Sequence, residues 1–252
     1  MGKVGGILVP GKRLAAAAQL AAASYFDGEK APYVAIDVGC DHARLAVYLV
    51  QTDLCSHVYA TDVASGPVQK AQKNIEQRTK KGKSLKDYIT VLQTDGLCGL
   101  EKYRASRIFI CGMGGQTIIN ILQNQNANFV RNKDKNPPVL ILQPQSNAFD
   151  VRLYLYNNGF DIINETVVCD GRFVYPIICA CYDGVPKQKS LIELAMGSIN
   201  LKKRDEGFEK LFYIVKKSTF KRLCATKQNG LPHKQDEMLY SQMCEYEKNV
   251  LL

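Results

Sequence analysis

The sequence lacks the signatures of metal-binding, secreted and membrane-spanning proteins. None of its nine cysteines stands in a CxxC pair, so the spacing typical of zinc sites is missing and we expect no metal site. No apolar run is long enough to span a bilayer, and no signal-peptide pattern precedes the first expected helix. We therefore expect a cytoplasmic protein whose thiols are reduced and act as small apolar side chains.

Acidic residues are the scarcer charge, and the excess of basic residues is uneven. The 252 residues include 33 Lys and Arg against 24 Asp and Glu, a formal charge of +9. Residues 185–252 hold 13 basic and 8 acidic side chains (+5), whereas residues 1–184 hold 20 and 16 (+4). A basic tail favours a polyanionic partner, and RNA more than a membrane. The alternative is that lysine-rich helices only face the solvent.

The stretch 33–45 carries the most informative pattern. Strand-forming apolar residues lead into Asp37, a glycine turn at Gly39, and then Asp41 and His42 at the start of an expected helix. This arrangement places backbone N–H groups at the carboxyl edge of a sheet, where α/β proteins bind nucleotide-like ligands. Two carboxylates would repel a phosphate but attract a sulfonium and an ammonium group. The stretch therefore predicts a site for S-adenosylmethionine (SAM) instead of a dinucleotide.

Strand and helix patterns alternate through most of the chain. Helices are expected over 12–26, 42–51, 65–79, 116–124 and 147–158, and strands over 33–38, 57–62, 89–93, 107–111 and 139–142. We expect Asp41 to cap the second helix and residues 125–137 to form a loop. An Asp170-Gly171 turn between strands 160–169 and 173–182 predicts a closing hairpin. The pattern is typical of a doubly wound α/β sheet of seven strands with an antiparallel edge, the layout of SAM-dependent methyltransferases.

The composition changes after Pro186. Apolar residues recur at near-heptad spacing over 208–223 and again over 239–250, with a break at 229–232 between them. This spacing predicts two helices packed as an antiparallel coiled-coil hairpin. We therefore divide the chain into a SAM-dependent methyltransferase domain, 1–184, which includes the helix at 12–26, and a helical, coiled-coil-like tail, 185–252.

Acidic residues close the first three expected strands of the sheet. Asp37 or Asp41 can pair with the ammonium group of the ligand, and Asp62 can accept both ribose hydroxyls. Asp95 can accept a hydrogen bond from the adenine amine, with the Gly96 backbone beside the ring. Two structural alternatives remain open, since caps and turns also recruit Asp: Asp41 as a helix cap only, and Asp62 as a turn residue only.

Two further features lie at the expected strand ends. The glycines of 112–115 let the backbone approach a ligand closely, or they only form a turn that starts a helix. His42 can contact the ligand or make a structural hydrogen bond. Tyr175 and Glu165 lie on the expected hairpin, which can reach the rim of the pocket.

These motifs together resemble the TrmK family, the bacterial tRNA (adenine-22-N1)-methyltransferases. The matching segments are Lys12–Leu14, Asp37–His42, Asp62 with Gly66 and Pro67, Thr94–Leu97, Gly112–Gly115, Leu140–Pro144, and Arg152 with Leu155 and Gly159. The resemblance spans about residues 10–182. Three positions depart from it: Gln145, where the family usually has Asn, Pro176, where it has Glu, and Asp62, where relatives commonly have Glu.

The resemblance implies a Rossmann-like class I methyltransferase that uses SAM, with tRNA as its partner and a basic tail that holds the tRNA. The methyl acceptor would be N1 of an adenine in the D arm, at position 22. The residues expected at the reacting base are Asp41, Gln143, Gln145 and, as a stacking surface, Tyr175. Those expected at the cofactor are Arg13, Asp37, Gly39, Cys40, Asp41, His42, Asp62, Val63, Asp95, Gly96, Gly112, Met113 and Gly114.

We also expect a monomer that contacts no membrane. Two alternative functions stay open. One is a SAM-dependent methyltransferase that acts on another RNA or on a small molecule. The other is a non-catalytic module that binds SAM or RNA, because folds outlast functions.

Overall fold

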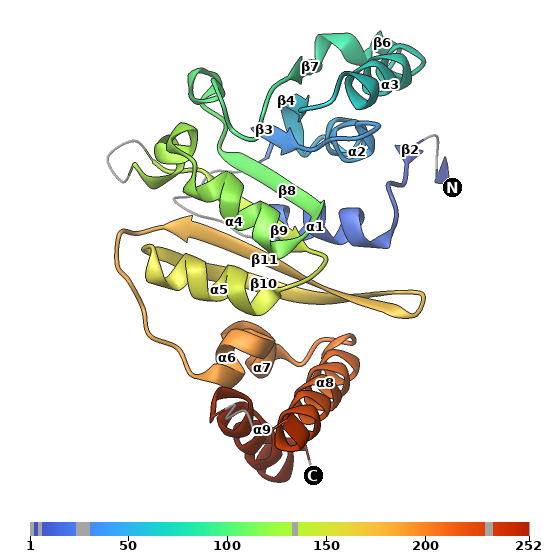
Figure 1. Cartoon of the computed structure of the whole chain (residues 1–252). Coiled ribbons are helices and arrows are strands. Elements are labelled where there is room, and N and C mark those ends of the chain that lie inside the picture. Colours follow the sequence, from blue (N-terminus) through green and yellow to red (C-terminus); the bar gives the residue numbers. More distant parts are fainter. Residues whose placement is uncertain (1–2, 5–6, 24–30, 133–135, 230–233, 252) are drawn as a thin grey trace.

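The computed structural model describes residues 3–4, 7–23, 31–132, 136–229 and 234–251. A seven-stranded sheet forms its centre (Figure 1). Its strands are β3 (Tyr33–Val38), β4 (Cys55–Asp62), β7 (Ile89–Gln93), β8 (Arg107–Met113), β9 (Val139–Pro144), β10 (Phe160–Asp170) and β11 (Phe173–Tyr182). Two short hairpins lie outside it: β1 (Lys3–Val4) with β2 (Ile7–Leu8), and β5 (Thr79–Lys80) with β6 (Lys83–Ser84).

The strand order is β10-β11-β9-β8-β3-β4-β7. β11 runs antiparallel to both β9 and β10, while the pairs from β9 to β7 are parallel. The antiparallel strand is thus the last in the sequence, as predicted, but it lies one place inside the sheet and β10 takes the edge. Residues 176–181 of β11 are continuously buried, so both faces of this strand are covered, whereas burial along the edge strand β10 is interrupted.

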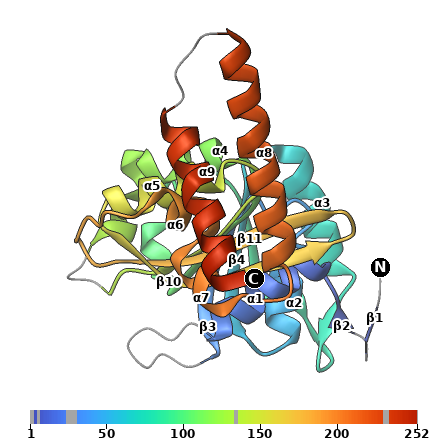
Figure 2. The ribbon, with the colours of Figure 1, turned by 90° about the horizontal axis from the view of Figure 1, so that it is seen from below.

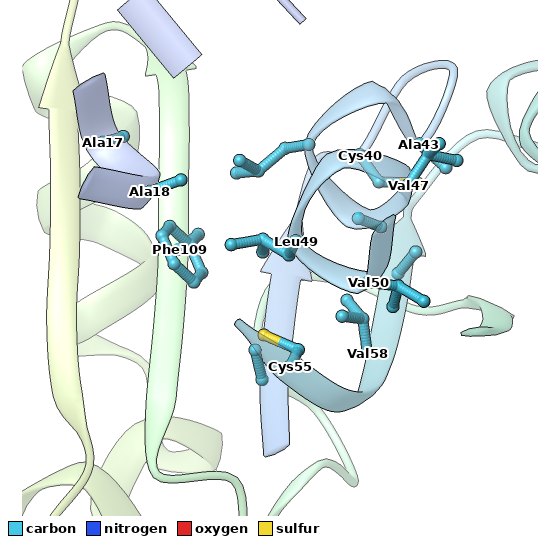
Figure 3. Packing of buried hydrophobic residues seen from close by; sticks show 14 of the residues in the cluster. Ala17, Ala18, Cys40, Ala43, Val47, Leu49, Val50, Cys55, Val58 and Phe109 are labelled. Carbon is cyan, nitrogen blue, oxygen red and sulfur yellow. The ribbon is translucent and has the colours of Figure 1, made fainter. Parts of the chain in front are cut away.

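Helices cover both faces of the sheet. α1 (Lys12–Ala23), α2 (Arg44–Gln51) and α3 (Ser65–Glu76) share one core, and α4 (Gly115–Gln123) and α5 (Ala148–Asn157) share the other. In the first core Phe109 of β8 points between Ala18 of α1 and Leu49 of α2 (Figure 3). The small alanine side chains of α1 let that helix approach the sheet closely. The chain changes face between the adjacent strands β3 and β8, which makes their carboxyl ends the switch point of the fold.

Several predicted boundaries shift. The predicted end of the first helix, residues 24–26, lies outside the described residues. The region predicted as a loop after α4 contains a short helix, η3 (Gln125–Arg131), and two further short turns are η1 (Leu85–Asp87) and η2 (Glu101–Tyr103).

The tail contains more helices than were predicted. α8 (Phe208–Asn229) and α9 (Lys234–Tyr246) are the expected pair, followed by η5 (Glu247–Leu251) and preceded by α6 (Leu191–Met196) and α7 (Ser198–Lys203). α8 and α9 lie side by side in Figures 1 and 2, and ion pairs Lys216–Glu247 and Arg222–Asp236 show that they run antiparallel. Supercoiling of the two helices, and the domain boundary at 184, stay predictions.

A buried ion pair joins the tail to the sheet. Arg152 Nε of α5 lies 2.6 Å from Glu165 Oε1 of β10, and both side chains are fully buried. The guanidinium also donates to the carbonyl oxygens of Leu194 (3.1 Å) and Ala195 (3.2 Å), near the end of α6. The other Glu165 oxygen accepts from the backbone N of Ile199 in α7 (3.4 Å). Glu165, placed by sequence only on the hairpin, is therefore a structural residue that fixes where the tail begins.

Candidate functional site

Asp37 lies at the carboxyl end of β3, beside the switch point. The residue is buried, and among the described residues its Oδ2 has no hydrogen-bond partner. Burial raises the pKa of the Asp37 carboxyl to about 7, and the nearby negative charge of Asp62 adds to the rise. An uncompensated buried acid at this place is suited to receive a cationic group.

The turn after β3 is held in an unusual backbone conformation. Gly39, Asp41 and Ala43 all have positive φ angles, of 70°, 49° and 53°. The turn is fixed to β4, because Cys40 N donates to the carbonyl oxygen of Thr61 (2.8 Å) and Asp41 N donates to Asp62 Oδ2 (3.3 Å). Left-handed backbone at residues with side chains costs free energy and is concentrated at functional sites.

The prediction that Asp41 caps the following helix is wrong. α2 begins at Arg44, and Ala43 takes the N-cap position without a side-chain hydrogen bond. The anchoring of the turn to β4 delays the helix by two residues. The Asp41 side chain is consequently 68% exposed, and its carboxylate lies 3.5 Å from His42 Nε2. It is available to a ligand or substrate instead of serving the helix.

Asp62 links two turns of the candidate site. Its carboxylate accepts from the backbone N of Asp41 (3.3 Å) and of Ala64 (3.1 Å), so it ties the turns after β3 and β4 together. Val63 and Asp95 are exposed at the same edge of the sheet, after β4 and β7. Cys40 is buried, and burial raises the pKa of its thiol, so it contributes packing and backbone here.

The second half of the site is the turn after β8. Gly112 has a φ of 80°, and a Cβ atom there would lie 3.3 Å from the Arg13 guanidinium and 3.7 Å from Gln145 Nε2. A Cβ atom on Gly39 would overlap the side chain of Met113, so the two turns are in contact. Glycine is favoured at 39 and 112 because the backbone there is left-handed and a Cβ atom would crowd a neighbouring side chain.

The prediction that Gln143 touches the reacting base conflicts with the structure. Its side chain is fully buried, its Oε1 accepts from Gly112 N (3.1 Å), and its Nε2 donates to the carbonyl oxygen of Pro144 (2.9 Å). Both ends of the amide are occupied by backbone. Gln143 therefore positions the turn after β8 and is not itself open to substrate.

Gln145, Tyr175 and Arg13 lie together at the mouth of the site. Gln145 is exposed, and its backbone N donates to the carbonyl oxygen of Met113 (2.8 Å). The pairing of Ile178 with Leu142 brings Tyr175 level with Gln145 across the sheet. Arg13 of α1 lies over the Tyr175 ring, with Cζ 5.2 Å from its centroid. Residues from α1, from the loop after β9 and from β11, far apart in sequence, thus share one edge of the sheet.

A groove of about 740 Å³ opens beside Gln145, a volume in the usual range of ligand pockets. Its walls are the loop after β9, the side of β11 that carries Val174 and Pro176, and the face of α8 that carries Leu211 and Ile214. No sequence pattern predicts this groove, because it forms only where the tail packs against the sheet.

Among the residues that the structure describes, no three His, Cys, Asp or Glu side chains gather where they could hold a metal ion. Within the same residues, no helix combines the length and the apolar character needed to cross a membrane.

The sequence matches a family model, TrmK, described as tRNA (adenine(22)-N(1))-methyltransferase, over residues 35–246. A curated Bacillus subtilis protein named tRNA (adenine(22)-N(1))-methyltransferase is 32% identical over 161 residues, 60% of this chain and 63% of that protein. The chain aligns with less than two thirds of the length of each curated relative that it matches, 61–64%.

Solved structures with the same fold extend over nearly the whole chain. The crystal structure of the B. subtilis m1A22 tRNA methyltransferase TrmK has a TM-score of 0.71 at 26% identity, covering 96% of this chain and 97% of that one. Sp1610 of Streptococcus pneumoniae, provisionally assigned as a tRNA (m1A22) methyltransferase and solved with SAM, has a TM-score of 0.72 at 26% identity, covering 96% and 99%.

Proposed function

This chain belongs to the TrmK family, and we propose that it transfers a methyl group from SAM to N1 of an adenine in the D arm of tRNA, at position 22. The observation that carries the proposal is the family match across both the sheet and the tail, over residues 35–246. The similar B. subtilis protein, named for this reaction, supports it.

The residues at the switch point fit SAM. The buried Asp37 carboxyl, with one oxygen that lacks a partner among the described residues, provides a counter-charge for a cation. Asp62 and the exposed Asp95 provide acceptors for ribose hydroxyls and an adenine amine. The Gly39 and Gly112 turns let the backbone approach closely. When bound, SAM supplies a methyl group on a sulfonium, which a nucleophile takes by direct displacement.

The chain's own part in the reaction is to place the base. Adenine N1 has a lone pair in the ring plane, so the base must leave its stack or pair before N1 can point at the methyl group. Tyr175 offers a stacking face, and Gln145 offers an amide oxygen to the positive charge that develops on the adenine. Orientation of this kind can contribute roughly 7–11 kcal/mol to lowering a barrier.

The proposed partner is tRNA, and the proposed location is the cytoplasm. The basic tail, +5 over residues 185–252, supports contact with the tRNA backbone. We place the protein in the cytoplasm as a monomer, in line with reduced cysteines and a tRNA substrate. No disulfide links the described cysteines.

Incubation with SAM and unmodified tRNA, followed by nucleoside mass spectrometry, tests the proposal. We expect N1-methyladenosine, and none when adenine 22 is replaced by another base. SAM binding in calorimetry without tRNA methylation would favour a different substrate. Absence of SAM binding would favour a non-catalytic module.

SAM affinity should depend on pH through Asp37. Below about pH 7 the buried carboxyl is protonated in the free protein, and a bound cation favours the carboxylate. Affinity should therefore rise from pH 5.5 to 7.5, by up to about tenfold per pH unit below the pKa. Calorimetry across this range is the measurement, and Asp37→Asn should bind more weakly with a flat profile. A pH-independent wild type would place the cation away from Asp37.

The free protein should respond to pH in the opposite sense. The folded-state pKa of Asp37, about 7, lies above the ordinary value of 3.8, so the folded state holds this proton more tightly than the unfolded state. The resulting contribution to stability is complete below about pH 4 and is lost as the pH rises to about 7. Urea unfolding of the wild type and of Asp37→Asn at pH 5 and pH 8 isolates this contribution from those of other groups.

Gln145→Ala and Asp41→Ala should each slow tRNA methylation by about 100-fold, the usual loss for one group that stabilises a developing charge. Gln145→Ala should leave SAM affinity unchanged, because that side chain is proposed to act on the base. Single-turnover kinetics with unmodified tRNA measure the rate. The matched control is Gln72→Ala, an exposed glutamine on α3. Wild-type turnover in both site variants would remove them from the reaction.

A further inference from the structure

A row of aromatic and cationic side chains follows one edge of β11. Arg172 Cζ lies 5.0 Å from the Phe173 ring centroid, and the Phe173 and Tyr175 centroids are 6.2 Å apart. Arg13 Cζ completes the row, 5.2 Å from the Tyr175 centroid. We call these four residues the stacking row. It ends where the Arg13 guanidinium approaches Gly112.

The row is built outside the hydrophobic core. Phe173 is 52% exposed and Arg172 is exposed, whereas Ile177, further along the same face of β11, is fully buried. Strand alternation sends Val174 to the opposite face, where it lines the groove beside α8. Packing within the core therefore does not explain an aromatic side chain at position 173.

The row leads from solvent to the candidate site. Because Ile178 pairs with Leu142, Tyr175 lies level with Gln145, just past the carboxyl end of β9. Phe173 lies two residues, about 7 Å, further out along the strand. Figure 1 shows the β10–β11 hairpin reaching beyond the rest of the sheet at this end.

Positive charge gathers at the outer end of the row. Arg172 stands beside Phe173, and Lys210 Nζ at the start of α8 donates to the carbonyl oxygen of Gly171 (3.3 Å). One acid, Asp170, is present in the same turn. The hairpin tip is thus in contact with the basic tail, and the two aromatic rings of the row lie between two guanidinium groups.

We propose that the stacking row holds the unstacked nucleobases that flank the methylated adenine, with Arg172 and Lys210 against the neighbouring phosphates. This inference rests on the proposed function, because extrusion of the target base leaves its neighbours unstacked. Aromatic and guanidinium planes stack on any base, so single-stranded RNA is the partner that fits two adjacent rings flanked by two cations. Because the stacking row is continuous with the site at Gln145, we expect both to bind the same tRNA molecule.

The test compares the affinity of unmodified tRNA for wild type and variants. Phe173→Ala should weaken binding about tenfold, which corresponds to about 1.4 kcal/mol, within the range for one stacked base. Phe173→Trp keeps an aromatic face and should bind like wild type. Arg172→Ala should lower the slope of log affinity against log salt by about one. Val185→Ala, a 54% exposed apolar residue beyond the other end of β11, is the matched control and should change nothing.

An abasic substitution scan identifies the base concerned. One abasic nucleotide next to the target adenine should weaken binding to wild type as much as Phe173→Ala does. The two changes together should cost no more than either alone, because they remove the same contact. Additive losses at every abasic position would overturn the inference.

The stacking row and the proposed function fail in different ways. Should wild type bind and methylate tRNA while Phe173→Ala retains full affinity, the row is not a base-binding surface and the proposed function stands. Should wild type bind SAM but neither bind nor methylate tRNA, both are overturned. SAM affinity is expected to be the same in the Arg172 and Phe173 variants, and thermal unfolding checks that each is folded.

Discussion

Arg152→Ala is expected to lower the free energy of unfolding by about 3–5 kcal/mol, the usual cost of removing one partner of a buried ion pair. The substitution leaves the Glu165 carboxylate buried without its cation. It also removes donors from the carbonyl oxygens of Leu194 and Ala195, two buried residues at the end of α6. Small domains have only about 5–15 kcal/mol of stability, so a loss of this size should also reduce the yield of folded protein.

Urea denaturation of single and double variants measures the effect. Arg152→Met with Glu165→Leu removes both charges, so the double variant should be more stable than Arg152→Ala alone. The control is Lys86→Ala, which breaks an ion pair with Glu76 of similar length (2.8 Å) between exposed side chains. Exposed pairs contribute about 0–1 kcal/mol, so Lys86→Ala should be nearly neutral. Equal losses for Arg152→Ala and Lys86→Ala would show that burial does not matter here.

Asp62→Ala is expected to weaken SAM binding by at least 100-fold. A carboxylate that accepts both ribose hydroxyls makes two charged hydrogen bonds, each contributing about 1.5–3 kcal/mol. The same substitution removes the acceptor for the backbone N of Asp41 and of Ala64, so the turn after β3 loses its anchor. Loss of the ribose hydrogen bonds and loss of the anchor for the turn both weaken SAM binding, because the Asp62 side chain shapes the site and is also proposed to bind the ligand.

Calorimetry with SAM measures the change, and two further variants separate the causes. Asp62→Glu keeps a carboxylate and should retain most of the affinity. Asp62→Asn keeps the size of the side chain, loses the charge, and should fall between Glu and Ala. Thermal unfolding of each variant checks the fold. Binding by Asp62→Ala within threefold of wild type would contradict the proposed ribose contact.

Much of the sheet was predictable because its signals are local. A buried strand needs a continuous apolar run, and turns need glycine or aspartate, so strands and their ends can be located from short windows. The strand predicted over 89–93 matches β7 residue for residue, and α8 and α9 lie where near-heptad spacing placed them. Because parallel strands end at one edge of a sheet, the sequence is enough to group Asp37, Asp62 and Asp95.

Other features depend on contacts between distant segments. Whether Asp41 caps α2 was decided by hydrogen bonds from the turn to β4, which delay the helix by two residues. Gln143 and Gln145 are the same residue type, two positions apart. Gln143 is buried against Gly112, whereas Gln145 is exposed. α6 and α7 are too short for periodicity to reveal, and the buried Arg152–Glu165 pair stabilises their placement.

The sequence by itself determined the class of fold, the acidic strand ends and the family, since each can be recognised from short motifs that follow one another in a fixed order. The tertiary structure decided which of those side chains remain accessible. It placed Arg13 and Tyr175 in contact across 162 positions of sequence, put Phe173 at the exposed end of the same row, and opened the groove beside α8. These arrangements come from strand register and from packing of the tail, which no local pattern specifies.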